Sequence, residues 1–305
     1  MDRGFRHRLS IIGTTLLLFS TLALVLAREV HPKGGLMLMA KKIAGELPAA
    51  PADGIWRGAA ALDIPLAPQA MAKPRIYEAT VKKLSVRALH NGREIAFLVE
   101  WDDRTEDILL GEDKFSDAVA LQFPSAAAKE KPHFAMGDRE NSVNIWFWKA
   151  SWRKQTDITK SYAVADDFVG GTLAGNPISE RKTPVENIVA QGFGSATDME
   201  KSAVQNVFGS GAWQADRWAV VFKRAMLSQN KLDVTFREGT ITPVAFALWN
   251  GSDGNRGGRK ALSTWYYVGL ETEEKKTLFL YPLLAFLVTA AVVAGIIIGL
   301  RKGRG

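Results

Sequence analysis

The sequence predicts an all-β fold, an antiparallel β-sandwich, from three observations. Apolar and polar residues alternate in several short segments, Gly and Pro separate these segments, and few stretches have a helical period. A period of two places every second side chain on the same face of a strand. Seven or eight such segments favour two antiparallel sheets packed face to face.

The clearest element is a hairpin around Asn91 and Gly92. Alternation runs over residues 84–88 and resumes over 95–101, on either side of this pair. Asn-Gly is a preferred two-residue hairpin loop because both of its residues tolerate positive φ. Further strands are expected over residues 117–123, 143–149, 217–224, 232–237, 242–249 and 263–270.

A long insertion over residues 162–214 interrupts this rhythm. It is rich in glycine, and a short helix is expected near residues 198–207. Loops of this length inside a compact domain are usually functional or disordered. We expect this one to cover a ligand site or a partner site.

Two apolar segments indicate a link to the membrane. Residues 10–27 carry no charge and follow Arg3, Arg6 and Arg8, so residues 1–27 are a signal peptide or an uncleaved anchor. Residues 278–300 are 23 uncharged residues followed by basic ones, which predicts a transmembrane helix with its C-terminus in the cytoplasm. The expected domains are therefore a linker over 28–54, an extracytoplasmic β-sandwich over 55–277, the helix, and a cytoplasmic tail over 301–305.

Composition excludes several classes of function. Of the net charge of +7, residues 1–8 contribute +2 and residues 301–305 contribute +3, so the basic balance belongs to the chain ends and no nucleic-acid partner is expected. The chain has no cysteine, which excludes disulfides, thiolate-held metal sites and covalent attachment of a c-type haem. It has four histidines; His7 lies in the basic leader and His90 in an apparent turn, so no multi-histidine metal cage is expected.

Several blocks within residues 50–270 carry a resemblance to a known family. They are AFLVEWDD (96–103), DAVALQFP (117–124), FAMG (134–137) with VNIWFWK (143–149), WAVVFKR (218–224), and FALWNGS (246–252) with WY (265–266). In order and spacing these blocks resemble the haem-binding gamma subunits of periplasmic molybdenum enzymes of the dimethyl sulfoxide reductase superfamily. Examples are the gamma subunits of ethylbenzene dehydrogenase, dimethyl sulfide dehydrogenase, selenate reductase and chlorate reductase.

The resemblance implies a β-sandwich that binds one non-covalent b-type haem through a methionine and a lysine. Met136 matches the family methionine, and Lys223 is our match for the lysine. The resemblance also implies partners, namely a molybdenum catalytic subunit and an iron–sulfur subunit, with a quinone or a cytochrome as a further redox partner. The membrane segments distinguish this chain from soluble members of the family.

The residues themselves support this pair less sharply. A thioether ligand favours ferrous iron, and a lysine ligates only as the neutral amine, which requires a desolvated site. Strand alternation places Ala219, Val221 and Lys223 on one face, so Lys223 follows two small apolar residues.

Each of these residues also has an ordinary interpretation. A methionine before a strand commonly fills a core, and Lys223 beside Arg224 also suits a solvated strand edge. His133 is the competing iron ligand, with a plain loop histidine as its alternative role.

The remaining site candidates are aromatic and basic residues. Trp146 and Trp148 share a face and either flank a porphyrin or fill the layer between the sheets, while Arg224 is included among the cofactor-binding candidates. The glycine-rich loop 251–260 carries Arg256, Arg259 and Lys260; these suit haem propionates or a partner protein, with a solvated loop as the default.

The function that follows is non-catalytic electron transfer by a membrane-anchored haem b subunit on the extracytoplasmic side. The alternative, from another class, is an exported and membrane-tethered β-sandwich that recognises carbohydrate or a cell surface without haem. A hydrolytic enzyme has little support, because no Gly-x-Ser-x-Gly elbow is present.

Overall fold

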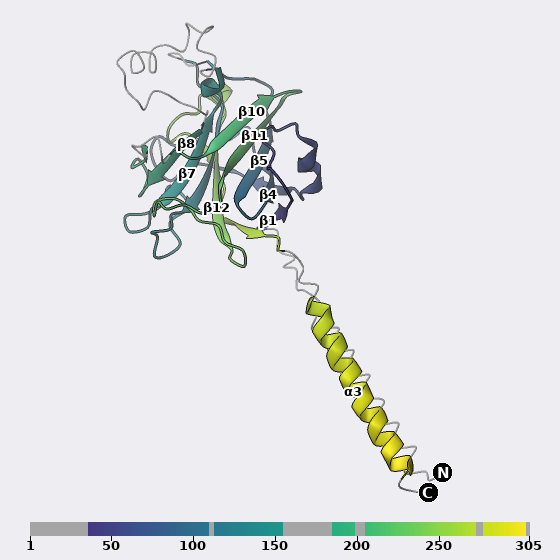
Figure 1. The fold of residues 1–305 in the computed structure, drawn as a ribbon. Helices are drawn as coiled ribbons and strands as arrows, with labels where there is room; N and C mark the ends of the chain where they lie inside the picture. The colour runs from purple at the N-terminus through teal and green to yellow at the C-terminus, as the bar shows by residue number, and fades with distance from the viewer. Residues whose placement is uncertain (1–35, 110–112, 155–184, 199–204, 273–276, 303–305) are drawn as a thin grey trace. The chain divides into compact units, whose positions relative to one another are not determined.

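The computed structural model describes residues 36–109, 113–154, 185–198, 205–272 and 277–302 (Figure 1). The signal peptide or anchor predicted over 1–27 and the end of the predicted tail lie outside these residues. The described elements are β1 (Met37–Lys42), η1 (Gly54–Gly58), β2 (Leu62–Pro65), β3 (Ala67–Pro68), β4 (Lys83–His90), β5 (Glu94–Asp102), β6 (Ala118–Pro124), β7 (Val143–Lys149), η2 (Ala150–Lys154), β8 (Val185–Ala190), β9 (Thr197–Asp198), β10 (Phe208–Trp213), β11 (Arg217–Ala225), β12 (Thr242–Trp249), η6 (Gly251–Asp253), β13 (Ala261–Leu262), β14 (Tyr266–Leu270) and α3 (Thr277–Lys302).

The described strands form one 14-stranded sheet that folds back on itself as a nearly closed sandwich (Figure 1). Its order is β10-β11-β5-β4-β1-β14-β12-β6-β7-β8-β9, with β2 beside β4, and β13 between β12 and β3. β1 and β14 lie in the middle of this order and join two halves. One half contains β10, β11, β5 and β4, and the other contains β12, β6, β7 and β8. The predicted sandwich of mostly antiparallel strands is confirmed, except that β1 pairs in parallel with both β14 and β4.

Aromatic side chains fill the space between the two halves. The rings of Phe97 on β5 and Phe123 on β6 lie 5.9 Å apart between centroids, and the rings of Trp148 on β7 and Trp218 on β11 lie 5.1 Å apart. All four side chains are fully buried. Burying aromatic surface of this size is a main source of stability for such a core.

The predicted hairpin is confirmed in position and turn. β4 and β5 pair antiparallel on either side of Asn91 and Gly92, and Gly92 adopts a φ of +83°. The side chain of Asn91 accepts hydrogen bonds from the backbone N–H groups of Arg93 and Glu94, which fixes the loop. His90, expected in the turn, is instead the fully buried last residue of β4, and its Nε2 lies 2.8 Å from the carbonyl oxygen of Glu271.

The other strand predictions are mostly confirmed, with two differences. Strands β6, β7, β11, β12 and β14 lie where alternation predicts them, but residues 232–237 form no strand. Their backbone groups make other hydrogen bonds. The N–H of Val234 donates to the side-chain oxygen of Asn144, and the N–H of Phe236 donates to the carbonyl oxygen of Met226. The predicted insertion 162–214 contributes β8, β9 and β10 in its described part; residues 199–204 of the expected helix lie outside the described residues, and 205–207 are not helical.

The chain divides into two compact units, residues 34–272 and a second unit that contains α3. α3 (Thr277–Lys302) covers the segment in which a transmembrane helix is predicted, and its side chains are described over 283–299. Within the described part of the chain, no helix has both the length and the apolar character needed to cross a membrane, so the predicted span is not supported by the structure.

Candidate functional site

A cavity of about 540 Å³ lies on the outer face of the sheet half that contains β6, β7 and β12. Its floor is made by outward side chains of these strands, among them Ala118, Ala120 and Ala247. Their neighbours along each strand point the other way, into the core between the sheets. Because four of the floor residues are alanines, the face leaves room for a planar ligand of the size that small-molecule pockets hold.

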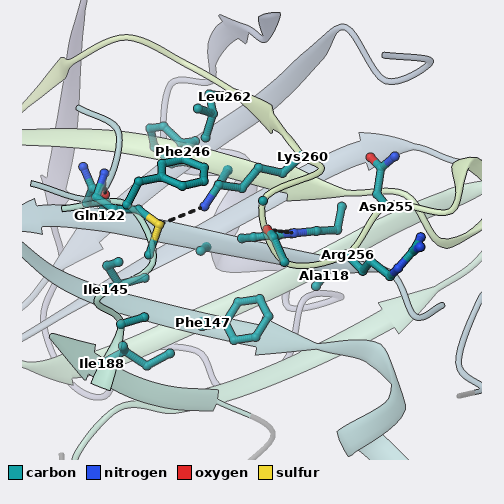
Figure 2. Close-up of a pocket in the computed structure, with 18 of the residues that line it drawn as sticks. Ala118, Gln122, Ile145, Phe147, Ile188, Phe246, Asn255, Arg256, Lys260 and Leu262 are labelled. Atoms are coloured by element: carbon teal, nitrogen blue, oxygen red, sulfur yellow. Dashed lines mark hydrogen bonds between the residues drawn. The ribbon is translucent and has the colours of Figure 1, made fainter. Parts of the chain in front are cut away.

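Loops from distant parts of the chain form the walls. They are residues 73–74, 134–136, 193–194 and 255–260. Phe193 and Gly194 belong to the insertion for which a covering role is predicted, and they do line this cavity. The lining is mainly apolar, with a small number of polar side chains (Figure 2).

Met136 enters the cavity from a tightly held loop. It adopts a φ of +67°, and Gly137 follows at +76°. A side chain at position 137 would lie 2.8 Å from the carbonyl oxygen of Asn141, so this step requires glycine. The backbone N–H of Met136 donates to Oε1 of Gln122 at 3.0 Å, and its carbonyl accepts from Gly192 at 2.7 Å. The strained conformation is therefore fixed from both sides and points the thioether inward.

Lys260 faces Met136 from the opposite wall. Its Nζ lies 3.4 Å from Sδ of Met136 (Figure 2), and the residue is 4% exposed. The amine also lies over the rings of Trp249 at 4.9 Å and Phe193 at 5.3 Å. Burial lowers the pKa of Lys260 to about 8. No ion pair of the described residues includes it.

A buried amine and a thioether thus meet in an apolar cavity. Both atoms carry lone pairs that bind transition metals, and the lowered pKa makes the neutral amine accessible near physiological pH. Within the described ranges, no cluster of three or more His, Asp or Glu residues is arranged to hold a metal ion. The donor set of this cavity is therefore Met136 and Lys260.

The structure does not bring Lys223 to Met136. Lys223 lies on β11, is half-buried, and its Nζ lies 5.7 Å from the centre of the Phe208 ring on β10. Alternation predicts correctly that it shares a face with Ala219 and Val221, but that face turns away from the inter-sheet core and packs against residues 43–59. Lys223 does not line the cavity.

The two tryptophans and Arg224 also lie away from the cavity. Trp146 and Trp148 are fully buried between the two sheet halves, as in the second of the two roles expected for them. Phe147, between them in sequence, lines the cavity instead. Arg224 is 2% exposed, and its guanidinium lies over the Trp146 ring and 3.6 Å from Oδ1 of Asp233.

His133, the competing iron ligand, lies on the Met136 loop but does not line the cavity. It is exposed, its ring stacks on Phe134, and its Nδ1 accepts the backbone N–H of Ala135.

Sequence reasoning named Lys260 only as a possible partner of haem propionates or of another protein and did not pair it with Met136, although the sequence holds a signal for its position. Lys260 precedes the short apolar strand β13, and alternation places it on the same face as Leu262. Both residues line the cavity, while Ala261 between them is part of the inter-sheet core. A lysine two residues before an outward leucine is unusual for a solvated loop.

Comparisons with known proteins match most of this chain. The sequence profile of the family described as ethylbenzene dehydrogenase matches residues 53–261. A protein of Haloferax mediterranei named as a respiratory nitrate reductase haem subunit is 28% identical over 74% of this chain and 69% of its own length. The chlorate reductase subunit gamma of Ideonella dechloratans is 24% identical over 84% of this chain and 93% of its own. The dimethylsulfide dehydrogenase subunit gamma of Rhodovulum sulfidophilum is 30% identical over 55% and 53%.

Solved structures give a weaker match. A family 9 carbohydrate-binding module from Caldicellulosiruptor kristjanssonii in complex with glucose covers 79% of this chain and 98% of its own, with a TM-score of 0.41 and 8% identity. A match at this level carries no argument about ligand or function.

Proposed function

Since the chain belongs to the ethylbenzene dehydrogenase family, whose relatives include gamma and haem subunits of reductase and dehydrogenase complexes, we propose that it is a haem-binding electron-transfer subunit. We further propose that Met136 and Lys260 are the two axial ligands of the iron. This pair replaces the pair of Met136 and Lys223 expected from the sequence. The observation that carries the proposal is the 3.4 Å contact between Sδ of Met136 and Nζ of Lys260 in an apolar cavity.

The residues of the cavity suit a haem on chemical grounds. A lysine binds iron only after its ammonium group loses a proton. Burial lowers the pKa of Lys260, which makes this deprotonation easier. The strained backbone at Met136 and the hydrogen bond that its N–H donates to Oε1 of Gln122 hold the thioether toward the amine before any ligand binds. The two donor atoms, which would hold the iron, lie 3.4 Å apart in the structure.

A bound haem would supply a one-electron redox centre, whose potential the thioether of Met136 would raise. The protein's own contribution is to hold the two donors in place, to cover the site with Phe193 and Trp249, and to exclude water with the alanine and leucine floor. The chain contains no cysteine, so the haem would be held without covalent links, as a single b-type group.

The partners and the location are part of the same proposal. The relatives are named as subunits of nitrate reductase, chlorate reductase and dimethylsulfide dehydrogenase. We propose that this chain acts in a respiratory complex of that kind, without catalysing the reaction itself. Its neighbours there would be an iron–sulfur subunit and a molybdenum subunit, and a quinone or a cytochrome would exchange electrons with the complex. The apolar segments 10–27 and 278–300 support anchoring to a membrane, with residues 55–277 on the extracytoplasmic side.

The test is a visible spectrum of the full chain, purified in detergent and supplied with haem. The expected result is a low-spin b-type spectrum with about one haem per chain by the pyridine haemochrome assay. Lys260→Ala and Met136→Ala should each lose the low-spin spectrum, because each removes one of the two axial donors, and each should weaken haem binding by at least roughly tenfold.

Lys223→Ala is the matched control, since it removes a lysine of the same domain that does not line the cavity. It should keep the spectrum of the unmodified chain. If Lys260→Ala kept an unchanged low-spin spectrum, the axial assignment would be overturned. A folded chain that takes up no haem would reject the electron-transfer function.

A further inference from the structure

The mouth of the cavity carries positive charge. Four cationic side chains line the cavity, and no Asp or Glu of the described residues does so. Lys260 lies at the bottom beside Met136, whereas Lys73 and Arg256 are exposed at the rim. Figure 2 shows Arg256 at the opposite end of the cavity from Gln122, which holds Met136. An apolar cavity whose exposed lining side chains include two cations suits a flat apolar ligand that also carries anionic groups.

Arg256 is held in place before any ligand binds. Its guanidinium lies 4.3 Å from the centre of the Phe115 ring, and Nη1 donates to the carbonyl oxygen of Gly254 at 2.9 Å. Phe115 also lines the cavity. A guanidinium stacked on an aromatic ring still presents N–H donors in its plane, in the fork that matches a carboxylate.

The two rim segments are tied together by one buried amide. Gln69 is 1% exposed, and its Nε2 donates to the carbonyls of Ala72 at 2.9 Å and Gly258 at 2.8 Å. Its Oε1 accepts the N–H of Ala72 at 2.8 Å. The same residue binds the cavity lysine through the backbone, because its N–H donates to the carbonyl of Lys260 at 3.0 Å.

Gln69 thereby sets the spacing of the whole rim. Lys73 directly follows Ala72, and Arg256 lies two residues before Gly258. Gly258 approaches Pro74 so closely that an added side chain would lie 3.1 Å from Cδ of Pro74. The segments that carry the two cations are therefore packed against each other and against the backbone of Lys260.

We propose that Lys73 and Arg256 bind the two propionate carboxylates of the haem, and that Gln69 is the positioning residue that holds them at the required spacing. This inference rests on the proposed function. Lys73 and Arg256 would pair with the carboxylates, and the alanine floor would contact the apolar part of the ring. The cationic rim is thus what selects a porphyrin with free carboxylates from one without them.

The experiment compares two ligands on the full chain in detergent. One is haem b, and the other is its dimethyl ester, which keeps the iron and the ring but has no carboxylates. The unmodified chain should bind haem b at least about tenfold more tightly than the ester, because two charge-assisted hydrogen bonds are lost with the ester. Both ligands should give the same low-spin spectrum, since the axial donors are unchanged.

Variants of the rim should remove this preference. Lys73→Met and Arg256→Gln should each weaken binding of haem b by about tenfold while leaving binding of the ester unchanged. Lys231→Met, an exposed lysine that does not line the cavity, is the matched control and should change neither value. Arg256→Gln should also lower the reduction potential, because a positive charge near the haem favours the ferrous state.

The role of Gln69 is tested by the ratio of the affinities for haem b and for its dimethyl ester. Gln69→Ala should reduce the preference for haem b over the ester and keep the low-spin spectrum, whereas a purely structural role would weaken both ligands equally. If the unmodified chain binds both ligands equally, the propionate assignment is overturned and the electron-transfer function stands. If neither ligand binds, both are overturned.

Discussion

The amine of Lys260 faces two aromatic rings and a thioether, and no described carboxylate pairs with it. Burial lowers the pKa of this amine from its ordinary 10.5 to about 8. Holding the charged form in such a place costs free energy of unfolding, and the cofactor-free protein carries this cost at neutral pH. The residue that we propose as an iron ligand therefore lowers the free energy of unfolding of the protein without a cofactor.

This cost predicts how stability changes with pH. Between about pH 8 and pH 10.5 the unfolded chain binds more protons at position 260 than the native chain, so the free energy of unfolding rises with pH across this window. Below pH 8 the full penalty applies, on the order of 3 kcal/mol. Lys260→Met should remove it and make the cofactor-free chain more stable at pH 7 by up to that amount. Urea unfolding at several pH values between 7 and 10.5 measures the difference, with Lys223→Met as the control; parallel curves for Lys260→Met and the unmodified chain would contradict it.

A second buried charge lies on the other side of the sheet. Arg224 and Asp233 are 1% and 0% exposed in their side chains, and Asp233 also accepts a hydrogen bond from Asn187 at 2.8 Å. Asp233→Ala should lower the free energy of unfolding by roughly 3–5 kcal/mol, because it leaves a buried guanidinium without its counter-ion. Asp63→Ala breaks the exposed pair with Lys83 and should cost no more than about 1 kcal/mol.

Chemical unfolding of both variants measures this contrast, and equal losses would contradict it. If Asp233→Ala does not fold, the double replacement of Arg224 by Met and Asp233 by Leu should restore folding, because no charge then remains buried. The haem spectrum of the double variant should be unchanged, since the pair does not line the cavity.

Single residues also mark the limit of sequence reasoning about the site. Alternation correctly places Lys223 with Ala219 and Val221, and Trp146 with Trp148, but it does not say which face of a strand meets the other sheet. Met136 is predicted as a ligand from the family resemblance, because its position before a strand alone also suits a core methionine. Lys260 could not be paired with it, because that contact depends on the packing of two loops 124 residues apart.

At the scale of elements, β10 shows how the two sheet halves come close together at one end. A side chain at Gly211 would lie 2.2 Å from Cζ2 of Trp148, and one at Gly209 would lie 2.1 Å from Cγ2 of Val185. The glycines of this strand therefore make room for side chains of β7 and β8. Strand glycines commonly mark such close approaches.

Replacing Gly211 tests this packing. Gly211→Ala should lower the free energy of unfolding by about 1–3 kcal/mol, because Trp148 is fully buried and has no space to move. Gly54→Ala is the matched control, since an added side chain there meets no atom within 4 Å and no positive φ is required. Thermal unfolding of the two variants measures the difference. Equal melting temperatures would show that the core yields to the added methyl group.

Elements that a pattern of neighbouring residues specifies were predictable from the sequence, whereas pairings between distant segments were not. The β4–β5 hairpin is encoded by alternation and by Asn91-Gly92, which act over neighbouring residues. β1 pairs with β14, more than 200 residues away, and no local pattern reports that contact. Residues 232–237 show the apolar–polar alternation of a strand. However, the backbone N–H of Val234 donates a hydrogen bond to the side chain of Asn144 and is not available for pairing with another strand.

At the scale of the whole molecule, the core and the cavity are separate clusters of side chains. The inter-sheet cluster contains Phe97, Trp146 and Phe236, whereas the cavity is lined from the outer face by residues such as Ile145 and Leu262. Loss of a ligand from the outer face should therefore leave most inter-sheet contacts intact. We expect the domain to fold without a bound haem.

The chain without haem should accordingly be folded and unfold cooperatively. Haem should add free energy of unfolding through binding alone, about 2.7 kcal/mol when its free concentration is 100 times the dissociation constant. Circular dichroism and urea unfolding with and without haem measure both quantities. A cofactor-free chain with β-structure but no cooperative transition would contradict this division. Lys260→Ala serves as the control, because it should gain less stability from the same concentration of haem.

The pairing of the first described strand with the last has a consequence for biosynthesis. Met136 is synthesised long before Lys260. In the same way, β1 cannot pair with β14 until residues 266–270 have been synthesised. A nascent chain therefore holds neither the pair of β1 with β14 nor both Met136 and Lys260 until residue 270 has been synthesised. Under the proposed function, haem would be inserted only after that point.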